Sequence, residues 1–222
     1  MILEFKNVTG KSRKFGLKDV SFQLERGYVM GLAGKNGAGK STLLDYIMEP
    51  KGKYSGEILL DGENILANHA EILNYLGFVS ENNIFFEKFT AKQNSELLGI
   101  FYKDWSQESF EANMEKMGVG LDLIVKNMSR GEYMKFQMAF AMAHKPKLYL
   151  IDEATSKMDP VFRKDFYNIM HEIIEDESAS IILVTHLEEE LEFKVDYVGI
   201  MENGKMISFN EVIWREDYYG NK

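Results

Sequence analysis

The chain has 222 residues, enough for one large domain or two small ones with a buried core. Hydrophobic residues make up 45% of the chain, and the absence of cysteine excludes disulfides and thiol chemistry. The formal net charge of -9 argues against a nucleic-acid partner, because proteins bind nucleic acids through a basic surface.

The sequence predicts neither a leader peptide nor a membrane span. The opening stretch "MILEFKNVTG" lacks the basic start and apolar run of a signal peptide. No segment approaches the roughly 18 consecutive apolar residues that a membrane helix needs. We therefore expect any membrane role to come through a partner protein.

Strand patterns dominate the first part of the chain. Residues 2–8 and 18–24 alternate apolar and polar side chains, as a half-buried strand does. The continuous apolar run "YVMGLA" at 28–33 is typical of a strand buried on both faces. A helix is expected near 40–48, and "GEILLDGENI" indicates a strand that turns at its Asp-Gly pair.

The character changes to helical over about 90–145. Thr90 and Gln93 have the spacing of a capping box at the start of this block, and Pro146 marks its end. We expect the block to form a separate helical subdomain.

The last part of the chain returns to alternating strands and helices. We expect strands in "LYLID" and "SIILVTH", helices over 160–175 and near 187–193, and a hairpin that turns at Asn203-Gly204. Buried strands separated by helices predict an α/β domain with a largely parallel sheet.

A phosphate-binding loop follows the buried strand at 28–33. The pattern G-x-x-x-x-G-K-S provides glycines that let backbone N–H groups surround a phosphate, ahead of a helix whose positive end faces the anion. In this pattern Lys40 reaches the β and γ phosphates and the Ser41 hydroxyl ligates Mg²⁺. The expected nucleotide-binding residues of the loop are Gly34, Lys35, Asn36, Gly37, Ala38, Gly39, Lys40, Ser41 and Thr42.

An acidic pair directly follows the apolar strand "LYLID". Asp152 at the strand end would lie beside the phosphate loop and hold Mg²⁺, directly or through water. Glu153 would polarise a water molecule against the γ phosphate. A solvated acidic pair is the alternative, and the upstream phosphate loop favours the functional interpretation.

The four histidines divide into two groups. His186 ends another buried strand that leads to the same sheet edge, so we expect it to sense the γ phosphate. His69, His144 and His171 lie in helical or polar surroundings, and we expect them at the surface.

The stretch "NMSRGEYMKF" has no evident chemistry of its own. Ser129 and Glu132 have capping-box spacing at the start of a helix, and Met134, Met138 and Met142 predict an apolar stripe along it. Composition alone indicates a structural role for this stretch.

The order of the motifs resembles that of the nucleotide-binding subunit of ABC (ATP-binding cassette) transporters. Walker A appears as "GKNGAGKST", the signature as "MSRGE", Walker B as "LYLIDE", the D-loop as "SKMD" and the H-loop as His186. The resemblance implies a single P-loop NTPase domain, 1–222, with an N-terminal antiparallel β-subdomain. A mainly parallel core sheet would occupy about 1–89 and 146–210, with a helical subdomain inserted over about 90–145.

The resemblance also implies site roles. ATP and Mg²⁺ are the expected cofactors, and Lys40, Glu153 and His186 are the expected catalytic residues. Phe15 occupies the place of an aromatic side chain that stacks on adenine. In "GFVSE", Glu81 stands where the family has Gln, and its carboxylate can approach Mg²⁺ alongside Ser41 and Asp152.

In this family the signature helix serves the nucleotide of a second subunit, so that ATP is sandwiched in a dimer. Ser129, Gly131 and Glu132 are the residues expected at that contact. A helix N-terminus with free N–H groups suits a γ phosphate. Arg130 replaces a signature Gly and Glu132 replaces Gln, but no catalytic residue is lost, so an active ATPase is predicted.

The expected partners are a second nucleotide-binding subunit and a separate integral membrane permease, with the chain in the cytoplasm at the inner face of the membrane. Its short length, the "SRG" signature and "FYKDWSQESFEANMEKMGV" resemble export cassettes of the antibiotic and peptide group. The alternative is a soluble or regulatory ABC-type ATPase that is not coupled to transport.

Overall fold

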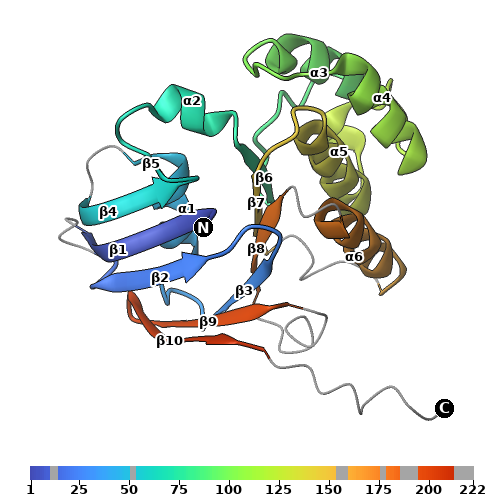
Figure 1. The fold of residues 1–222 in the computed structure, drawn as a ribbon. Helices are drawn as coiled ribbons and strands as arrows, with labels where there is room; N and C mark the ends of the chain where they lie inside the picture. The colour runs from blue at the N-terminus through green and yellow to red at the C-terminus, as the bar shows by residue number, and fades with distance from the viewer. Residues whose placement is uncertain (11–14, 51–53, 154–159, 176–178, 186–194, 213–222) are drawn as a thin grey trace.

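Two β-sheets and a group of helices form the layers of the molecule (Figure 1). The computed structural model describes residues 1–10, 15–50, 54–153, 160–175, 179–185 and 195–212. Figure 1 shows the six-stranded sheet between the four-stranded sheet on one side and helices α3 to α6 on the other.

The four-stranded sheet is antiparallel and has the order β2-β1-β4-β5. Its strands are β1 (Leu3–Gly10), β2 (Val20–Leu24), β4 (Tyr54–Leu60) and β5 (Glu63–Asn64). The turn between β4 and β5 falls at Asp61 and Gly62, whose φ angles of 52° and 81° are the left-handed pair that a tight hairpin needs. The predicted bend is therefore confirmed.

The six-stranded sheet has the order β10-β9-β3-β8-β7-β6 and is parallel except at its β9-β10 hairpin. Its strands are β3 (Val29–Ala33), β6 (Leu76–Ser80), β7 (Leu148–Asp152), β8 (Ser180–Val184), β9 (Tyr197–Glu202) and β10 (Lys205–Glu211). The hairpin turns at Asn203-Gly204 as predicted, with both residues at positive φ.

The helices fall into two groups. Beside the antiparallel sheet are α1 (Lys40–Met48) and α2 (His69–Leu73); the others are α3 (Ala91–Gly99), α4 (Gln107–Lys116), the 3₁₀ turn η1 (Val125–Asn127), α5 (Arg130–Met142) and α6 (Pro160–Glu175). Both predicted capping boxes form. Thr90 and Gln93 cap α3, and Ser129 and Glu132 cap α5.

Strands β7 and β8 separate two apolar cores. Tyr149 and Ile151 of β7 point into the core beneath α4, α5 and α6, whereas Leu148 and Leu150 point into the core shared with α1 and the antiparallel sheet. This alternation follows from the two-residue period of a strand, and it explains why the strand sequence is apolar throughout.

Some elements and burials differ from expectation. The sequence pattern indicated neither α2 nor the strand β6, and the predicted helix near 187–193 lies outside the described residues. The expectation for His144 was wrong: it is buried, stacks on Tyr102 at 4.0 Å and has its Nε2 3.1 Å from the Leu76 carbonyl oxygen. Burial lowers its pKa, so a helical context was a poor guide to its exposure.

Candidate nucleotide site

The phosphate loop lies between β3 and α1, at the carboxyl end of the parallel sheet. Gly39 caps α1 at φ 112°, a conformation that suits glycine. A Cβ on Gly34 would lie 2.4 Å from the Met201 carbonyl oxygen of β9, so only glycine fits there. The hairpin also supports the loop from behind, since the Gly204 N–H donates to the Ala38 carbonyl at 2.8 Å.

Lys40 is held inside the loop. Its side chain is only 4% exposed, and its Nζ donates to the Gly34 carbonyl at 2.8 Å and lies 3.4 Å from the Lys35 carbonyl oxygen. The same Nζ is 3.7 Å from Glu153 Oε1 at the end of β7. The phosphate loop and the Walker B strand therefore converge on one ammonium group.

Ser41 and Asp152 form the second link between these elements. The Ser41 hydroxyl donates to Asp152 Oδ1 at 3.5 Å. Burial raises the pKa of the Asp152 carboxyl, and the hydrogen bond from Ser41 opposes that shift. A divalent cation at this position would favour the carboxylate form and receive oxygen ligands of the kind Mg²⁺ prefers.

The loop borders a cavity of about 380 Å³. Phe15 lies at this cavity, and a Cβ added to Gly39 would lie 3.3 Å from its ring. The lining consists of Phe15, Asn36, Gly37, Gly39, Lys40, Ser41, Thr42 and Glu153. A half-exposed aromatic ring beside a buried cation and an N–H-lined loop fits a nucleoside triphosphate, with the base on the ring and the phosphates in the loop.

The metal would be held jointly by protein and nucleotide. No group of three or more His, Cys, Asp or Glu side chains capable of holding a metal occurs among the described residues. Ser41 and Asp152 supply two oxygens, and Mg²⁺ commonly takes the rest of its ligands from phosphates and water.

Glu81 directly follows β6. The last residue of that strand, Ser80, pairs with Asp152 of the neighbouring strand β7, so Glu81 leaves the sheet near the proposed metal ligand Asp152. The Glu81 carboxylate is ion-paired with Arg130 of α5, and it would have to exchange that contact to reach a cation.

The signature residues lie elsewhere. Within the described residues, the lining of the loop cavity includes none of Ser129, Gly131 and Glu132. The Ser129 hydroxyl accepts the Glu132 N–H at 3.3 Å, and Glu132 Oε2 accepts the Ser129 N–H at 2.8 Å. These contacts lower the pKa of Glu132. His186 and the "SKMD" segment lie outside the described residues.

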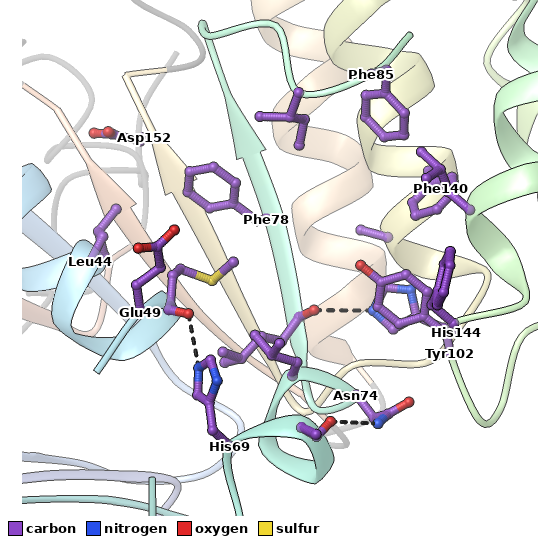
Figure 2. A pocket seen from close by; sticks show the side chains of 18 of the residues that line it. Leu44, Glu49, His69, Asn74, Phe78, Phe85, Tyr102, Phe140, His144 and Asp152 are labelled. Carbon is purple, nitrogen blue, oxygen red and sulfur yellow. Dashed lines mark hydrogen bonds between the residues drawn. The ribbon is translucent and has the colours of Figure 1, made fainter. Parts of the chain in front are cut away.

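A second, larger cavity of about 830 Å³ lies between α1, α2 and α5 (Figure 2). We call it the α1–α5 groove; its lining includes Leu44, Met48, Leu73, Phe78, Ile84, Phe85, Phe101, Tyr102, Phe140 and Asp152. Figure 2 shows Phe78 between Asp152 on one side and Phe85 and Phe140 on the other. The groove thus extends from the aromatic side chains of Phe85 and Phe140 to Asp152, which belongs to the nucleotide site.

Comparison with known proteins identifies the class. The profile described as "ABC transporter" matches residues 17–156, which contain the phosphate loop, the signature helix and the Asp152-Glu153 pair. The chain therefore belongs to the ABC transporter family. It is an ATP-binding and ATP-hydrolysing cassette of that family.

Relatives named for the transport of different substances resemble it. The bacitracin transport ATP-binding protein BcrA of Bacillus licheniformis is 30% identical over 85% of this chain and 62% of its own length. A methionine import ATP-binding protein, MetN 1 of Pseudomonas fluorescens, is 30% identical over 95% of this chain and 68% of its own. The solved structure of an ATP-binding subunit of an ABC transporter superposes with a TM-score of 0.86 at 25% identity, covering 96% of this chain and 90% of that one.

Proposed function

We propose that the cassette binds Mg²⁺·ATP in the loop cavity, pairs with a second cassette over the nucleotide, and powers a separate membrane permease, in the direction of export. The observation that carries this proposal is the convergence of Lys40, Ser41, Asp152 and Glu153 at one end of the parallel sheet. Lys40 binds the terminal phosphates, while Ser41 and Asp152 hold the cation, which neutralises charge on the phosphates.

Glu153 acts on the attacking water. Its Oε1 is 3.7 Å from Lys40 Nζ, and this distance supports a role for the carboxylate beside the terminal phosphate that the ammonium is proposed to bind. A carboxylate in this place can accept a hydrogen bond from water and orient it for attack. His186, which comes two positions after β8 in the sequence, is proposed to contact the γ phosphate.

The α5 N-terminus is the proposed contact for the partner's nucleotide. The Ser129 and Glu132 N–H groups donate to the capping box. The positive end of the helix dipole is still available to an anion at the α5 N-terminus. The signature residues do not line the cavity of their own chain, which supports a site completed by a second subunit. ATP then stabilises the dimer, and its hydrolysis allows the two subunits to separate.

The α1–α5 groove is the proposed docking site for the permease. Large apolar side chains lie exposed at and near its α3 side, with Ile100 73% and Phe101 75% exposed. Exposed apolar groups around a concave site are typical of a protein interface. None of the helices in the described part of the chain has the length and apolar character that crossing a bilayer requires. We therefore propose a peripheral place at the cytoplasmic face of the membrane.

Two measurements test the proposal. Phosphate release is compared between the wild type and the isosteric variant Glu153→Gln under single-turnover conditions, with ATP binding measured separately. We expect both proteins to bind ATP and the variant to release phosphate about a thousandfold more slowly. Equal rates would contradict the role of Glu153.

The second measurement is copurification. A multi-span membrane protein should copurify with the wild type and be lost from Phe101→Glu, a substitution of an exposed side chain outside the nucleotide cavity. A cassette that hydrolyses ATP but retains no membrane protein in either form would instead be a soluble or regulatory ATPase.

A further inference from the structure

The turn between β9 and β10 contacts both of the segments that the proposed function assigns to the nucleotide. Gly204 lies in this turn at φ 82° and is buried. Its N–H donates to the Ala38 carbonyl of the phosphate loop at 2.8 Å, and its carbonyl accepts the Lys18 N–H at 2.8 Å. Lys18 follows Phe15 by three positions, so a single glycine joins the phosphate loop to the segment that carries the aromatic ring.

Gly204 has no room for a side chain. A Cβ on this residue would lie 2.3 Å from the carbonyl oxygen of Gly16, which directly follows Phe15. The next atoms that it would meet belong to Gly16 and Leu17, at 3.4 Å and 3.6 Å. All three atoms lie in segment 15–18, so a methyl group at Gly204 would displace the aromatic side of the site rather than the phosphate loop.

Tyr46 makes a second contact with segment 15–18. It lies in α1, the helix that continues the phosphate loop, and it is 4% exposed. Burial raises the pKa of its hydroxyl, and a hydrogen bond from the Leu17 backbone opposes that rise. The same Leu17 accepts the Gly10 N–H at 2.8 Å through its carbonyl. The segment is therefore bonded to β1, to α1 and to the β9–β10 turn.

These contacts fix the spacing between the two ends of the proposed nucleotide site. The Phe15 ring is 39% exposed, so its position depends on the backbone of its segment more than on packing around the ring. A nucleotide has a fixed reach from its base to its phosphates, and it gains affinity from both ends only when the ring and the loop match that reach. Because the protein holds the two ends in place beforehand, binding does not have to order them.

We propose that Gly204 and Tyr46 are positioning residues that hold the Phe15 ring at stacking distance from a base whose phosphates lie in the phosphate loop. They thereby set how much affinity the base adds to that of the triphosphate. Neither residue touches the nucleotide, and both act through segment 15–18. The proposal rests on the proposed function, because it takes Phe15 as the residue that stacks on the base.

Titration calorimetry with ATP and with inorganic tripolyphosphate, which has no base, separates the two ends of the site. Both titrations are made in EDTA, so that ATP is not hydrolysed. Gly204→Ala should weaken ATP binding roughly 10-fold, the effect of losing one stacked base, and leave tripolyphosphate binding unchanged. Gly62→Ala is the matched control, because Gly62 has the same place in the β4–β5 turn at φ 81° and a Cβ there meets nothing within 4 Å. It should bind both ligands as the wild type does.

Tyr46→Phe tests the proposal without a change to the backbone. It removes only the hydroxyl, and we expect it to weaken ATP binding roughly fivefold and to leave tripolyphosphate binding unchanged. Tyr54→Phe is the matched control. The Tyr54 ring stacks on Tyr46 at 5.3 Å, and its buried hydroxyl has no hydrogen-bond partner in the described part of the chain. The control should bind both ligands as the wild type does.

Combination with Phe15→Ala shows whether the two residues act through the ring. In that background, Gly204→Ala and Tyr46→Phe should have no further effect on ATP binding, because no ring is left to position. A further effect as large as in the wild type would overturn the proposal, as would an equal loss of ATP and tripolyphosphate binding. Unchanged ATP affinity in both single variants would also overturn it. Full ATP affinity in Phe15→Ala would overturn the stacking role in the proposed function, and with it this proposal.

Discussion

The Ser41 hydroxyl donates to Asp152 Oδ1 at 3.5 Å, and this contact joins the first turn of α1 to the carboxyl end of β7. Because burial raises the pKa of the Asp152 carboxyl, the carboxylate has a desolvation cost in the folded state. At pH values between the ordinary and the raised pKa of Asp152, the native state binds more protons than the unfolded chain. The contribution of Asp152 to the free energy of unfolding therefore falls as the pH rises through this range.

Asp152→Asn should therefore raise the stability of the fold while it lowers the ATPase activity. At neutral pH, without nucleotide or Mg²⁺, we expect the variant to melt at a higher temperature than the wild type, and the gain should shrink as the pH falls below the raised pKa. Mg²⁺-dependent ATPase activity should fall about 100-fold, because the cation loses a positioned ligand. Calorimetry over a pH series with a parallel ATPase assay checks both, and a lower melting temperature at neutral pH would contradict the assigned cost.

Phe15 is expected to contribute to nucleotide affinity through its ring. Phe15→Ala should weaken ATP binding by roughly 1–3 kcal/mol, the range for stacking of a base on an aromatic side chain. Phe15 is 39% exposed, so the fold should be little affected, and Phe15→Tyr should retain affinity. Titration calorimetry with ATP measures the difference. Equal affinity of the Ala and Tyr variants would exclude a stacking role.

Ser129 combines a helix cap with the predicted phosphate contact, and two substitutions distinguish these roles. Asp and Asn are N-caps as good as Ser, so Ser129→Asp and Ser129→Asn should leave the stability of α5 nearly unchanged. Only Asp places a negative charge against the partner's γ phosphate. In a Glu153→Gln background, size exclusion with Mg²⁺·ATP should detect a dimer for Ser129→Asn and none for Ser129→Asp; dimers of both would remove the phosphate contact from the account.

Gly99 offers a prediction about the helical region. Gly to Ala within a helix ordinarily adds stability, but a Cβ on Gly99 would lie 2.3 Å from the Trp105 ring. We expect Gly99→Ala to lower the free energy of unfolding by roughly 1–3 kcal/mol through overpacking. Gly120→Ala is the control, because a Cβ there meets nothing within 4 Å. Urea denaturation compares the two variants, and similar midpoints would show that Trp105 adapts without cost.

The fold followed from the sequence wherever the signal is local. The capping boxes, the Asp61-Gly62 bend and the Asn203-Gly204 turn depend on residues a few positions apart, and each forms as predicted. Buried strands such as β7 can also be predicted from the sequence, because both of their faces are apolar. Strand β6 was not indicated, and its place in the sheet depends on pairing with β7, far away in the chain.

The site divides in the same way. The phosphate loop and the Asp152-Glu153 pair carry their chemistry in short motifs, and the structure brings Lys40 and Glu153 within 3.7 Å. Gln137, whose amide bonds to the Ser80 backbone, gave no such signal, because a glutamine inside a helix is ordinarily a surface residue. Its burial depends on the edge of β6, which only the assembled fold creates. The pairing of Glu81 with Arg130 has no local signal, because the two residues lie far apart in the chain and meet only when α5 packs beside β6.

Complementation tests the central claim, that each nucleotide is bound between two copies of the cassette. Lys40→Ala removes the phosphate-loop cation and keeps the signature, whereas Ser129→Asp keeps the loop and disables the signature. Each variant alone should be inactive. If the site is shared, mixing them creates dimers with one intact composite site, and single-turnover phosphate release should reappear. A mixture as inactive as either variant alone would contradict the shared site and indicate that each chain binds and hydrolyses ATP by itself.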